Sequence, residues 1–275
     1  MQIGIHLPHA GEQATPERIR RAAQRAEDLG LSDVWVSEHI IVPRATFPRS
    51  PLFYDPVLSL TWAAAVTMRV RLGTSVLVLP MRHPLPLAKE LATLQNFSEG
   101  RLILGAGVGW LEAEFAALGV PFHERGKRID EGIAMMRAVW TQDPVSFESK
   151  YIAAEIREMT MRPLPDKPIP IWFGARSEAA FRRTVRIGEG WHGSQLTPAE
   201  AAPVVARLRR DRPEPEFTIS MRTHWDGKDQ GELRERLAAY AEIGVQHAMV
   251  HPLNRDIDDW DAVIKGTGRV AATAL

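Results

Sequence analysis

The pattern of apolar and polar positions alternates between two periods along the chain. Short runs of branched and apolar residues are typical of buried strands, and each is followed by a longer stretch with the spacing of an amphipathic helix. The predicted strands cover 2–7, 33–37, 71–79, 101–108, 171–174, 190–193, 217–223 and 246–251. The predicted helices cover 15–30, 57–68, 85–98, 110–141 with a break near 119–123, 178–188, 199–210, 231–244 and a last stretch from about 257. Eight strand–helix units in roughly 250 residues predict a (β/α)8 TIM barrel, with a doubly wound open sheet as the alternative.

The alternation is interrupted once, before the fifth strand. Two short β-like pieces, Val145–Glu148 and Tyr151–Ala154, are followed by a proline-rich connection. We interpret residues 143–170 as an insertion that carries a hairpin. No low-complexity linker is visible, so the sequence predicts one TIM-barrel domain over residues 1–275.

Composition narrows the classes of function. The chain has 34 basic and 34 acidic residues, and this balance argues against nucleic acid or an anionic membrane as partner. It has no cysteine, which excludes disulfides, thiol nucleophiles and cysteine-held clusters. No apolar run approaches the ~20 residues of a membrane span, and the first residues do not form an export signal. We therefore expect a cytoplasmic protein.

A glycine-rich loop follows the fourth strand. Gly105, Gly107 and Gly109 remove every Cβ where this strand ends, so a bulky ligand can lie against the backbone. The alternative is that the glycines only allow close packing of a helix on the strand. A dinucleotide fingerprint is disfavoured, because Trp110 stands where its third glycine would be and the loop is not on the first strand.

A second loop, between the fifth strand and its helix, is suited to an anion. Its residues Gly174, Ala175, Arg176 and Ser177 combine amides at a helix N-terminus, a serine cap and an arginine, which together form a plausible phosphate cradle. The alternative is an ordinary cap with a solvent-facing arginine. Glycine-bearing loops on neighbouring strands indicate a long ligand with a phosphate at one end.

Histidines gather at the ends of the predicted strands. Those at or just beyond a C-terminal strand end, where a TIM barrel has its active face, are His9, His39, His83, His192, His224 and His251. His39 is the strongest candidate to touch substrate. A metal-dependent hydrolase on the same fold is disfavoured, because the spacing of His6 and His9 along a strand turns them to opposite faces and no carboxylate ends the fourth or the eighth strand.

Three segments carry a resemblance to a known family. They are Ser37-Glu38-His39, RLGTSVLVLPMRHPLPLAKELATLQNFSEGRLILGAGVGW (71–110) and PIPIWFGARSEAAFRRTVRIGEGWHG (168–193). Together they resemble the luciferase-like monooxygenase superfamily, and within it the branch of probable F420-dependent oxidoreductases. The resemblance spans essentially the whole chain and implies a TIM barrel that carries the deazaflavin coenzyme F420 or FMN. It also implies a homodimer.

The resemblance assigns roles to particular residues. His39 matches the active-face histidine beside the ring of the cofactor and is the implied catalytic residue. Ser75 and Val76 match a bulge behind that ring with a non-proline cis peptide between them, at a place where small residues interrupt an apolar strand; the alternative is an ordinary trans strand. The implied cofactor-binding set is Glu38, His39, Thr74, Ser75, Val76, Gly105, Gly107, Gly109, Trp110, Gly174, Ala175, Arg176 and Ser177.

One departure bears on the substrate. The F420-dependent sugar-phosphate dehydrogenases of this superfamily have a carboxylate proton donor after the glycine loop, where this chain has Trp110. The basic residues that hold the sugar phosphate also have no clear match, so sugar-phosphate oxidation is in doubt. We predict hydride transfer between F420 and a small organic substrate, with His39 as acid or base. The alternatives are an FMN-dependent monooxygenase served by a separate reductase and a non-catalytic cofactor-binding protein.

Overall fold

The strands form a closed parallel barrel. In the computed structural model, which describes all residues except 48, 153, 254–259 and 274–275, the sheet runs in the order β3-β2-β1-β11-β10-β9-β8-β5-β4 and closes because β3 also pairs with β5. The strands are β1 (Gln2–His6), β2 (Asp33–Val36), β3 (Arg71–Thr74), β4 (Leu77–Val78), β5 (Leu102–Gly107), β8 (Ile171–Phe173), β9 (Gly190–Ser194), β10 (Thr218–Trp225) and β11 (His247–Pro252). Since β3 and β4 are two halves of one strand position, the barrel has eight positions, as predicted.

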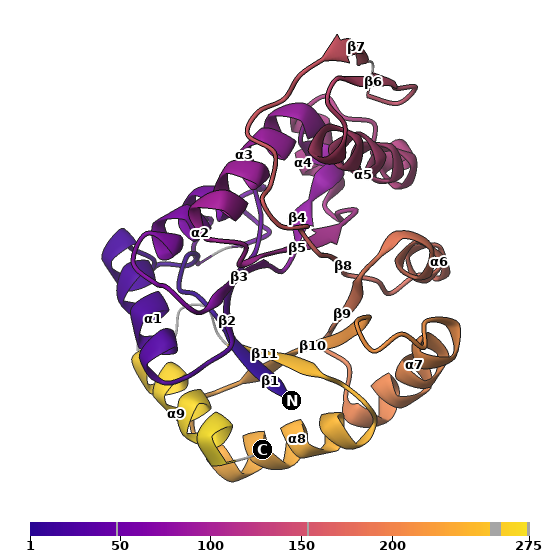
Figure 1. Cartoon of the computed structure of the whole chain (residues 1–275). Helices are drawn as coiled ribbons and strands as arrows, with labels where there is room; N and C mark the ends of the chain where they lie inside the picture. The colour runs from indigo at the N-terminus through magenta and orange to yellow at the C-terminus, as the bar shows by residue number, and fades with distance from the viewer. Residues whose placement is uncertain (48, 153, 254–259, 274–275) are drawn as a thin grey trace.

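Helices ring the barrel on its outside (Figure 1). They are α1 (Pro16–Asp28), α2 (Pro56–Ala64), α3 (Pro84–Phe97), α4 (Glu112–Ala117), α5 (Arg125–Thr141), α6 (Glu178–Ile187), α7 (Pro198–Asp211), α8 (Gln230–Glu242) and α9 (Trp260–Thr273), with short 3-10 turns at Leu79–Met81 and Phe122–Glu124. The predicted break in the fourth helix is confirmed between α4 and α5. The predicted start of the last helix near 257 lies outside the described residues. No helix in the described part of the chain combines the length and the apolar character needed to cross a bilayer.

Polar caps and prolines explain where several helices begin. Thr15 accepts a hydrogen bond from the backbone N–H of Arg18 at the start of α1, and Pro16 occupies the first turn. At α7, Thr197 and Glu200 form a reciprocal capping box. Both caps are formed by residues three positions apart in the sequence.

The end of α2 differs from the prediction. The helix was expected to reach residue 68 but ends at Ala64. Beyond it, the carboxylate of Glu27 on α1 accepts hydrogen bonds from the backbone N–H groups of Met68, Arg69 and Val70, all within 3.1 Å. These donors bond to a side chain of another helix, so they are unavailable to continue α2.

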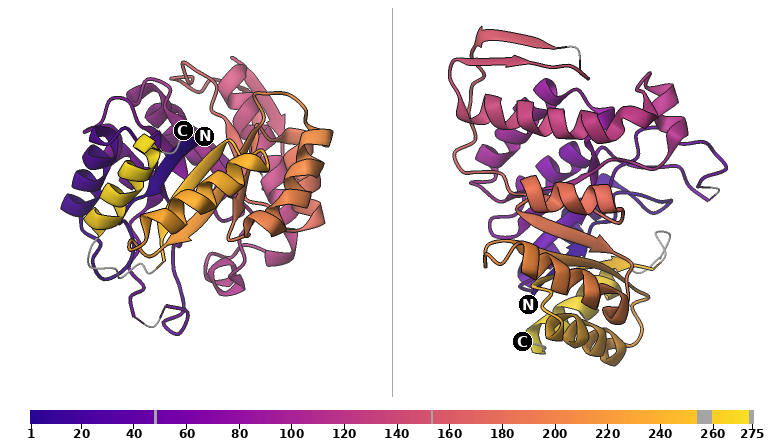
Figure 2. Two further views of the ribbon diagram at one scale, coloured as in Figure 1. Left: turned by 90° about the horizontal axis from the view of Figure 1, so that it is seen from below. Right: turned by 90° about the vertical axis from the view of Figure 1, so that its right-hand side faces the viewer.

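The insertion before the fifth barrel position forms a two-stranded hairpin beyond α5 (Figures 1 and 2). Strand β6 (Val145–Glu148) lies where the sequence predicts it, but its partner β7 is Glu155–Met159, so the prediction of a strand at Tyr151–Ala154 is wrong. The carboxylate of Glu131 accepts hydrogen bonds from the backbone N–H groups of residues 150 and 151, at 2.6 and 2.7 Å. This bonding turns the chain there and delays the second strand.

The barrel interior depends on glycines that let strands and rings approach closely. A Cβ on Gly73 would lie 2.2 Å from the ring of Trp35, which is fully buried. A Cβ on Gly105 would lie 1.7 Å from the backbone oxygen of Thr74 on the neighbouring β3. At both positions a neighbouring group, the Trp35 ring or the Thr74 backbone, leaves no space for a side chain.

We predict that Gly105→Ala destabilises the protein, because the added methyl group meets a backbone oxygen that a rotamer change cannot move. The expected loss is about 3 kcal/mol, the upper end of the usual range for overpacking. Gly132→Ala on α5 is the matched control, since its Cβ would meet nothing nearer than 3.7 Å and helix propensity favours alanine by up to ~1 kcal/mol. Urea unfolding followed by tryptophan fluorescence measures both, and equal midpoints for wild type and Gly105→Ala would contradict the close approach of β3 and β5.

Candidate active site

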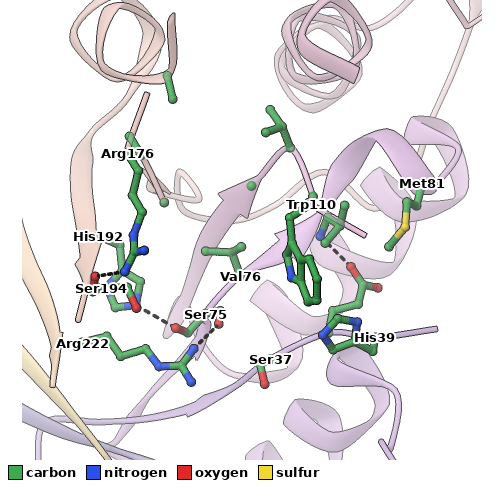
Figure 3. A pocket seen from close by; sticks show the side chains of 18 of the residues that line it. Ser37, His39, Ser75, Val76, Met81, Trp110, Arg176, His192, Ser194 and Arg222 are labelled. Atoms are coloured by element: carbon green, nitrogen blue, oxygen red, sulfur yellow. Dashed lines mark hydrogen bonds between the residues drawn. The ribbon is translucent and has the colours of Figure 1, made fainter. Parts of the chain in front are cut away.

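A cavity of about 520 Å³ opens at the C-terminal ends of the barrel strands (Figure 3). Its walls are formed by residues that follow β2 and β8, by the β3–β4 break, and by residues of β4, β5, β9 and β10. The lining residues are Ser37, Glu38, His39, Ser75, Val76, Val78, Met81, Gly107, Val108, Gly109, Trp110, Glu114, Phe115, Gly174, Ala175, Arg176, Ser177, Ala180, His192, Ser194, Gln195 and Arg222. All but two of the site residues predicted from the sequence are therefore brought together.

The two that do not line the cavity are Thr74 and Gly105. The Thr74 hydroxyl donates a hydrogen bond of 2.8 Å to the backbone oxygen of Gly105, and both residues are buried between β3 and β5. For Gly105, close packing between elements is thus the observed role, which is the alternative considered above for the glycine loop. Both residues support the cavity wall from behind.

The break in the third strand position projects one apolar side chain into the cavity. The peptide between Ser75 and Val76 is cis, as predicted, and it separates β3 from β4. A Cβ on Gly107 would lie 2.4 Å from Val76 Cγ2, and a Cβ on Gly174 would lie 3.1 Å from Val76 Cγ1. Val76 therefore forms an apolar ridge that two glycine backbones flank, and this ridge offers a convex surface to a flat ring.

Glu38 anchors this wall. Its buried carboxylate accepts hydrogen bonds of 2.6 Å from the backbone N–H of Val78 on β4 and from Nε of Arg82. Arg82 also donates to Asp55, the N-cap of α2, at 2.6 Å. Burial raises the pKa of Glu38 despite the attraction of the Arg82 guanidinium. The sequence predicts that Glu38 contacts the cofactor. The geometry adds a positioning role, because the carboxylate of Glu38 holds Val78 and Arg82 in place.

His39 is paired with a carboxylate that the sequence analysis missed. Glu114 Oε2 lies 2.8 Å from His39 Nδ1, and Glu114 Oε1 accepts from the backbone N–H groups of Ile40 and Ile41 at 2.9 and 3.3 Å. A carboxylate only accepts, so the hydrogen-bond network assigns a proton to Nδ1 and leaves the lone pair of Nε2 available. The sequence carries one weak signal for Glu114. It is an acidic residue in the first turn of α4, four residues after Trp110.

Aromatic rings enclose His39. Phe47 and Phe53 each have a ring centroid 5.0 Å from the imidazole, and Trp110 lies at 6.0 Å with its plane nearly perpendicular. Trp110 is 65% exposed and stands at the rim of the cavity. Aromatic rings therefore pack around the imidazole on this side, where Ser37 and Met81 also line the cavity (Figure 3).

The opposite side carries two guanidinium groups (Figure 3). Arg176 donates to the backbone oxygen of Ser194 at 2.6 Å, and Arg222 donates to the backbone oxygen of Ser75 at 3.3 Å. Ser177 caps α6 and accepts from the backbone N–H of Ala180. A helix N-terminus beside arginines attracts phosphate, so this side suits the phosphate cradle inferred from the sequence. Arg222 was missed because a single arginine on a predicted strand carries no local signal.

The remaining histidines divide by position. Among those predicted at strand ends, His39 and His192 line the cavity, whereas His83 caps α3. The expectation that His6 and His9 face apart is wrong: their ring centroids are 5.0 Å apart, because β1 ends at His6 and the chain turns before His9. Among the described residues, no group of three or more acidic, cysteine or histidine side chains is arranged to hold a metal ion.

His192 is buried beneath Ser75. Its Nε2 lies 2.8 Å from the Ser75 hydroxyl and its Nδ1 lies 2.7 Å from the hydroxyl of Ser220. Burial, with smaller contributions from His247 and Arg222, lowers the pKa of His192 to about 3. The imidazole is therefore neutral near neutral pH.

The sequence model of a family described as luciferase-like monooxygenase matches residues 1–265 of this chain. A relative named F420-dependent glucose-6-phosphate dehydrogenase, from Kineococcus radiotolerans, is 34% identical over 186 residues, which are 66% of this chain and 53% of that protein. A protein of the same name from Amycolatopsis mediterranei is 29% identical over 261 residues, covering 89% of this chain and 76% of that protein. The chain thus spans about half the length of the first relative and three quarters of the second.

Solved structures share the fold. The crystal structure of the monooxygenase RslO1 from Streptomyces bottropensis superposes with a TM-score of 0.83 at 22% identity, over 100% of this chain and 98% of that one. An F420-dependent secondary alcohol dehydrogenase in complex with an F420–acetone adduct superposes with a TM-score of 0.81 at 19% identity, over 98% and 97% of the two chains. At these identities the similarity establishes the barrel fold alone, and the chemistry has to be inferred from the residues of the site.

We predict that His192 makes the protein sensitive to acid. Its folded-state pKa of about 3 lies below the unfolded value of about 6.5, so protons bind the unfolded chain more tightly and stability falls as the pH drops from about 6.5 towards 3. Between about pH 7 and pH 5 the wild type should lose about 2 kcal/mol more than His192→Gln.

Denaturant titrations of the two proteins at both pH values measure this difference. Asp33 and the other carboxylates titrate mainly below this window in the unfolded chain, so they contribute little to the comparison. The same pH dependence in both proteins would show that the His192 imidazole protonates as in an unfolded chain.

Proposed function

The chain belongs to the luciferase-like monooxygenase family, and from this premise we propose that it is an F420-dependent oxidoreductase that transfers a hydride between the deazaflavin and a small organic substrate. One observation carries the proposal. A single cavity joins the His39–Glu114 pair on one side to Arg176 and the N-terminus of α6 on the other, with the Val76 ridge between them.

The residues fit a long cofactor with a flat ring and a phosphate in its tail. The Val76 ridge would support the ring, and Gly107 and Gly174 leave the space beside it that a Cβ would fill. Arg176 and the capped start of α6 would hold the phosphate. When bound, the deazaflavin supplies a ring carbon that accepts or releases a hydride. The relatives named as F420-dependent dehydrogenases support this choice over FMN.

His39 handles the proton that accompanies the hydride. Its Nε2 lone pair can take the hydroxyl proton of an alcohol, and its protonated form can return a proton to a carbonyl oxygen. Glu114 holds the imidazole in this tautomer and stabilises the charge that forms on it, as the carboxylate does in a catalytic triad. The three backbone and side-chain hydrogen bonds to Glu114 keep that carboxylate in place.

The substrate side favours a small, weakly polar molecule. Trp110, Phe47 and Phe53 surround His39, and the two guanidinium groups lie across the cavity, with Arg176 beside the inferred phosphate site. A sugar phosphate would need a second cationic site on the aromatic side, and the described lining residues there include none. We therefore propose small alcohols and ketones as the substrate class. The homodimer, the cytoplasmic location and the separate reductase of the monooxygenase alternative stay predictions.

We predict that F420 binds at least about tenfold more tightly than FMN, which corresponds to about 1.4 kcal/mol. The reasons are the similarity to relatives named as F420-dependent and the position of Arg176 beside the inferred phosphate loop. Parallel titrations of the apoprotein, followed by the quenching of cofactor fluorescence, measure both affinities. Equal affinities, or FMN retained through purification at full occupancy, would favour the monooxygenase alternative.

We also predict that His39→Ala keeps the cofactor and lowers turnover by about 10²-fold or more, the usual scale for removal of a general acid or base. Turnover is measured by the absorbance of F420 with a panel of small alcohols, and of reduced F420 with the matching ketones. Glu114→Gln is the companion variant, expected to lose part of this activity by disturbing the His39 tautomer. Turnover of His39→Ala within threefold of the wild type would remove His39 from the mechanism.

A further inference from the structure

A continuous line of buried hydrogen bonds crosses the barrel from the cavity to its opposite end. The Ser75 hydroxyl lies 2.8 Å from His192 Nε2, and His192 Nδ1 lies 2.7 Å from the Ser220 hydroxyl. That hydroxyl lies 2.7 Å from His247 Nδ1, and His247 Nε2 lies 2.8 Å from Asp33 Oδ1. All five residues are buried. We call this line the Asp33 relay; it joins β2, β11, β10 and β9 and ends at the cavity in Ser75, which directly follows β3.

The far end of the relay is a carboxylate that stays ionised. Asp33 is the first residue of β2, so it lies at the barrel end opposite the cavity. It also accepts hydrogen bonds from Trp35 Nε1 and from Arg71 Nη2, the latter at 2.7 Å. Burial alone would raise the pKa of Asp33, but His247, Arg71 and Trp35 together hold it well below its usual range.

While both imidazoles of the relay are neutral, the ionised carboxylate determines the direction of every hydrogen bond in it. Because Asp33 only accepts, His247 carries its proton on Nε2 and turns the lone pair of Nδ1 to Ser220. Ser220 must donate to that lone pair, so it accepts the Nδ1 proton of His192. The lone pair of His192 Nε2 then requires the hydroxyl proton of Ser75. Reversing any one bond would bring two lone pairs or two protons together within 2.8 Å.

The consequence falls on the cavity. Because the hydroxyl proton of Ser75 is donated to His192, the Ser75 oxygen can only accept a hydrogen bond from a ligand. A neutral His192 preserves this arrangement, and its lowered pKa keeps it neutral near neutral pH. A further proton on His247 would leave its bond to Asp33 unchanged, reverse the other three bonds and turn Ser75 into a donor, which the burial of both imidazoles disfavours.

We propose that the Asp33 relay holds the Ser75 hydroxyl as a hydrogen-bond acceptor, and that this acceptor binds the ring N–H of the cofactor. This inference rests on the proposed function, because the oxidised rings of flavins and deazaflavins each carry one N–H, in the pyrimidine part between two carbonyl groups. Ser75 is then a specificity-determining residue of the cofactor site. Asp33, on the far side of the barrel, is a positioning residue that acts through the relay.

The direction of the relay is testable without cofactor. Nitrogen-15 spectra of the histidine rings in the apoprotein should show His192 protonated on Nδ1. Asp33→Asn removes the charge and offers an amide N–H to His247 Nε2, so the relay can reverse and His192 should become protonated on Nε2. Asp130→Asn is the matched control, because it removes a carboxylate that pairs with Arg183 outside the relay, and it should leave the His192 spectrum unchanged.

The ligand half is tested with FMN and FMN methylated at the ring N–H, in wild type, Asp33→Asn and Ser220→Ala. Methylation should weaken binding to the wild type at least about tenfold, the scale of one hydrogen bond plus the crowding of the methyl group. In both variants the methylation penalty should fall below about threefold, because Ser75 is no longer held as an acceptor. The crowding is common to all three proteins, so the change in the penalty reports the hydrogen bond.

The outcomes are distinct. A wild-type His192 protonated on Nε2, or a methylation penalty unchanged in the variants, would overturn the inference. If Asp33→Asn does not fold, Ser220→Ala and the wild-type spectrum still decide it. Failure of the wild type to bind either FMN or F420 would overturn the proposed function and the assigned ligand, whereas the spectra would still decide the direction of the relay.

Discussion

The site depends on the close approach of β3 and β5. The absence of a side chain at Gly105 lets the backbone of Thr74 come so near that a Cβ would be 1.7 Å from its oxygen. From this fixed point the chain turns away from regular pairing at Ser75 and Val76, and it rejoins the sheet as β4, which Glu38 holds through Val78. The Val76 ridge thus lies between two fixed points of the third strand position, Thr74 against Gly105 and Val78 bonded to Glu38.

Three buried carboxylates then organise the polar groups, each in a different way. Glu38 fixes a wall through a backbone N–H and Arg82, Glu114 orients an imidazole at the cavity, and Asp33 orients a line of side chains through the barrel. Each accepts several hydrogen bonds, which is the condition for keeping a charge in the interior of a protein. The site is therefore preorganised by groups that lie mostly behind the surface that a ligand would touch.

Local patterns in the sequence predicted the barrel, the helix starts and most of the lining. The glycines at 107 and 109, the Ser177 cap and the interrupted third strand were visible because each depends on residues close in sequence. Glu114 and Asp33 were not, since their partners are 75 and 214 residues away and only the closed sheet brings them together. The hairpin strand was misplaced for the same reason, because the turn before it is made by Glu131 on α5. Contacts between distant segments thus decide the protonation and orientation of the site.

The two histidines of the cavity show how contacts between distant segments determine the chemistry of the site. His39 and His192 are each assigned a proton on Nδ1 and a lone pair on Nε2, and in each case a carboxylate determines the assignment, directly from Glu114 or through a hydroxyl and a second imidazole from Asp33. The lone pair of His39 is available to a substrate, whereas that of His192 is used by the Ser75 hydroxyl. The same tautomer therefore has two different results. At His39 it leaves Nε2 as a proton acceptor on the aromatic side, and at His192 it makes the bonded Ser75 hydroxyl a hydrogen-bond acceptor beside the Val76 ridge. In the function that we propose, proton transfer at His39 and ring recognition at Ser75 are therefore separate, because one hydroxyl stands between the His192 imidazole and the ligand.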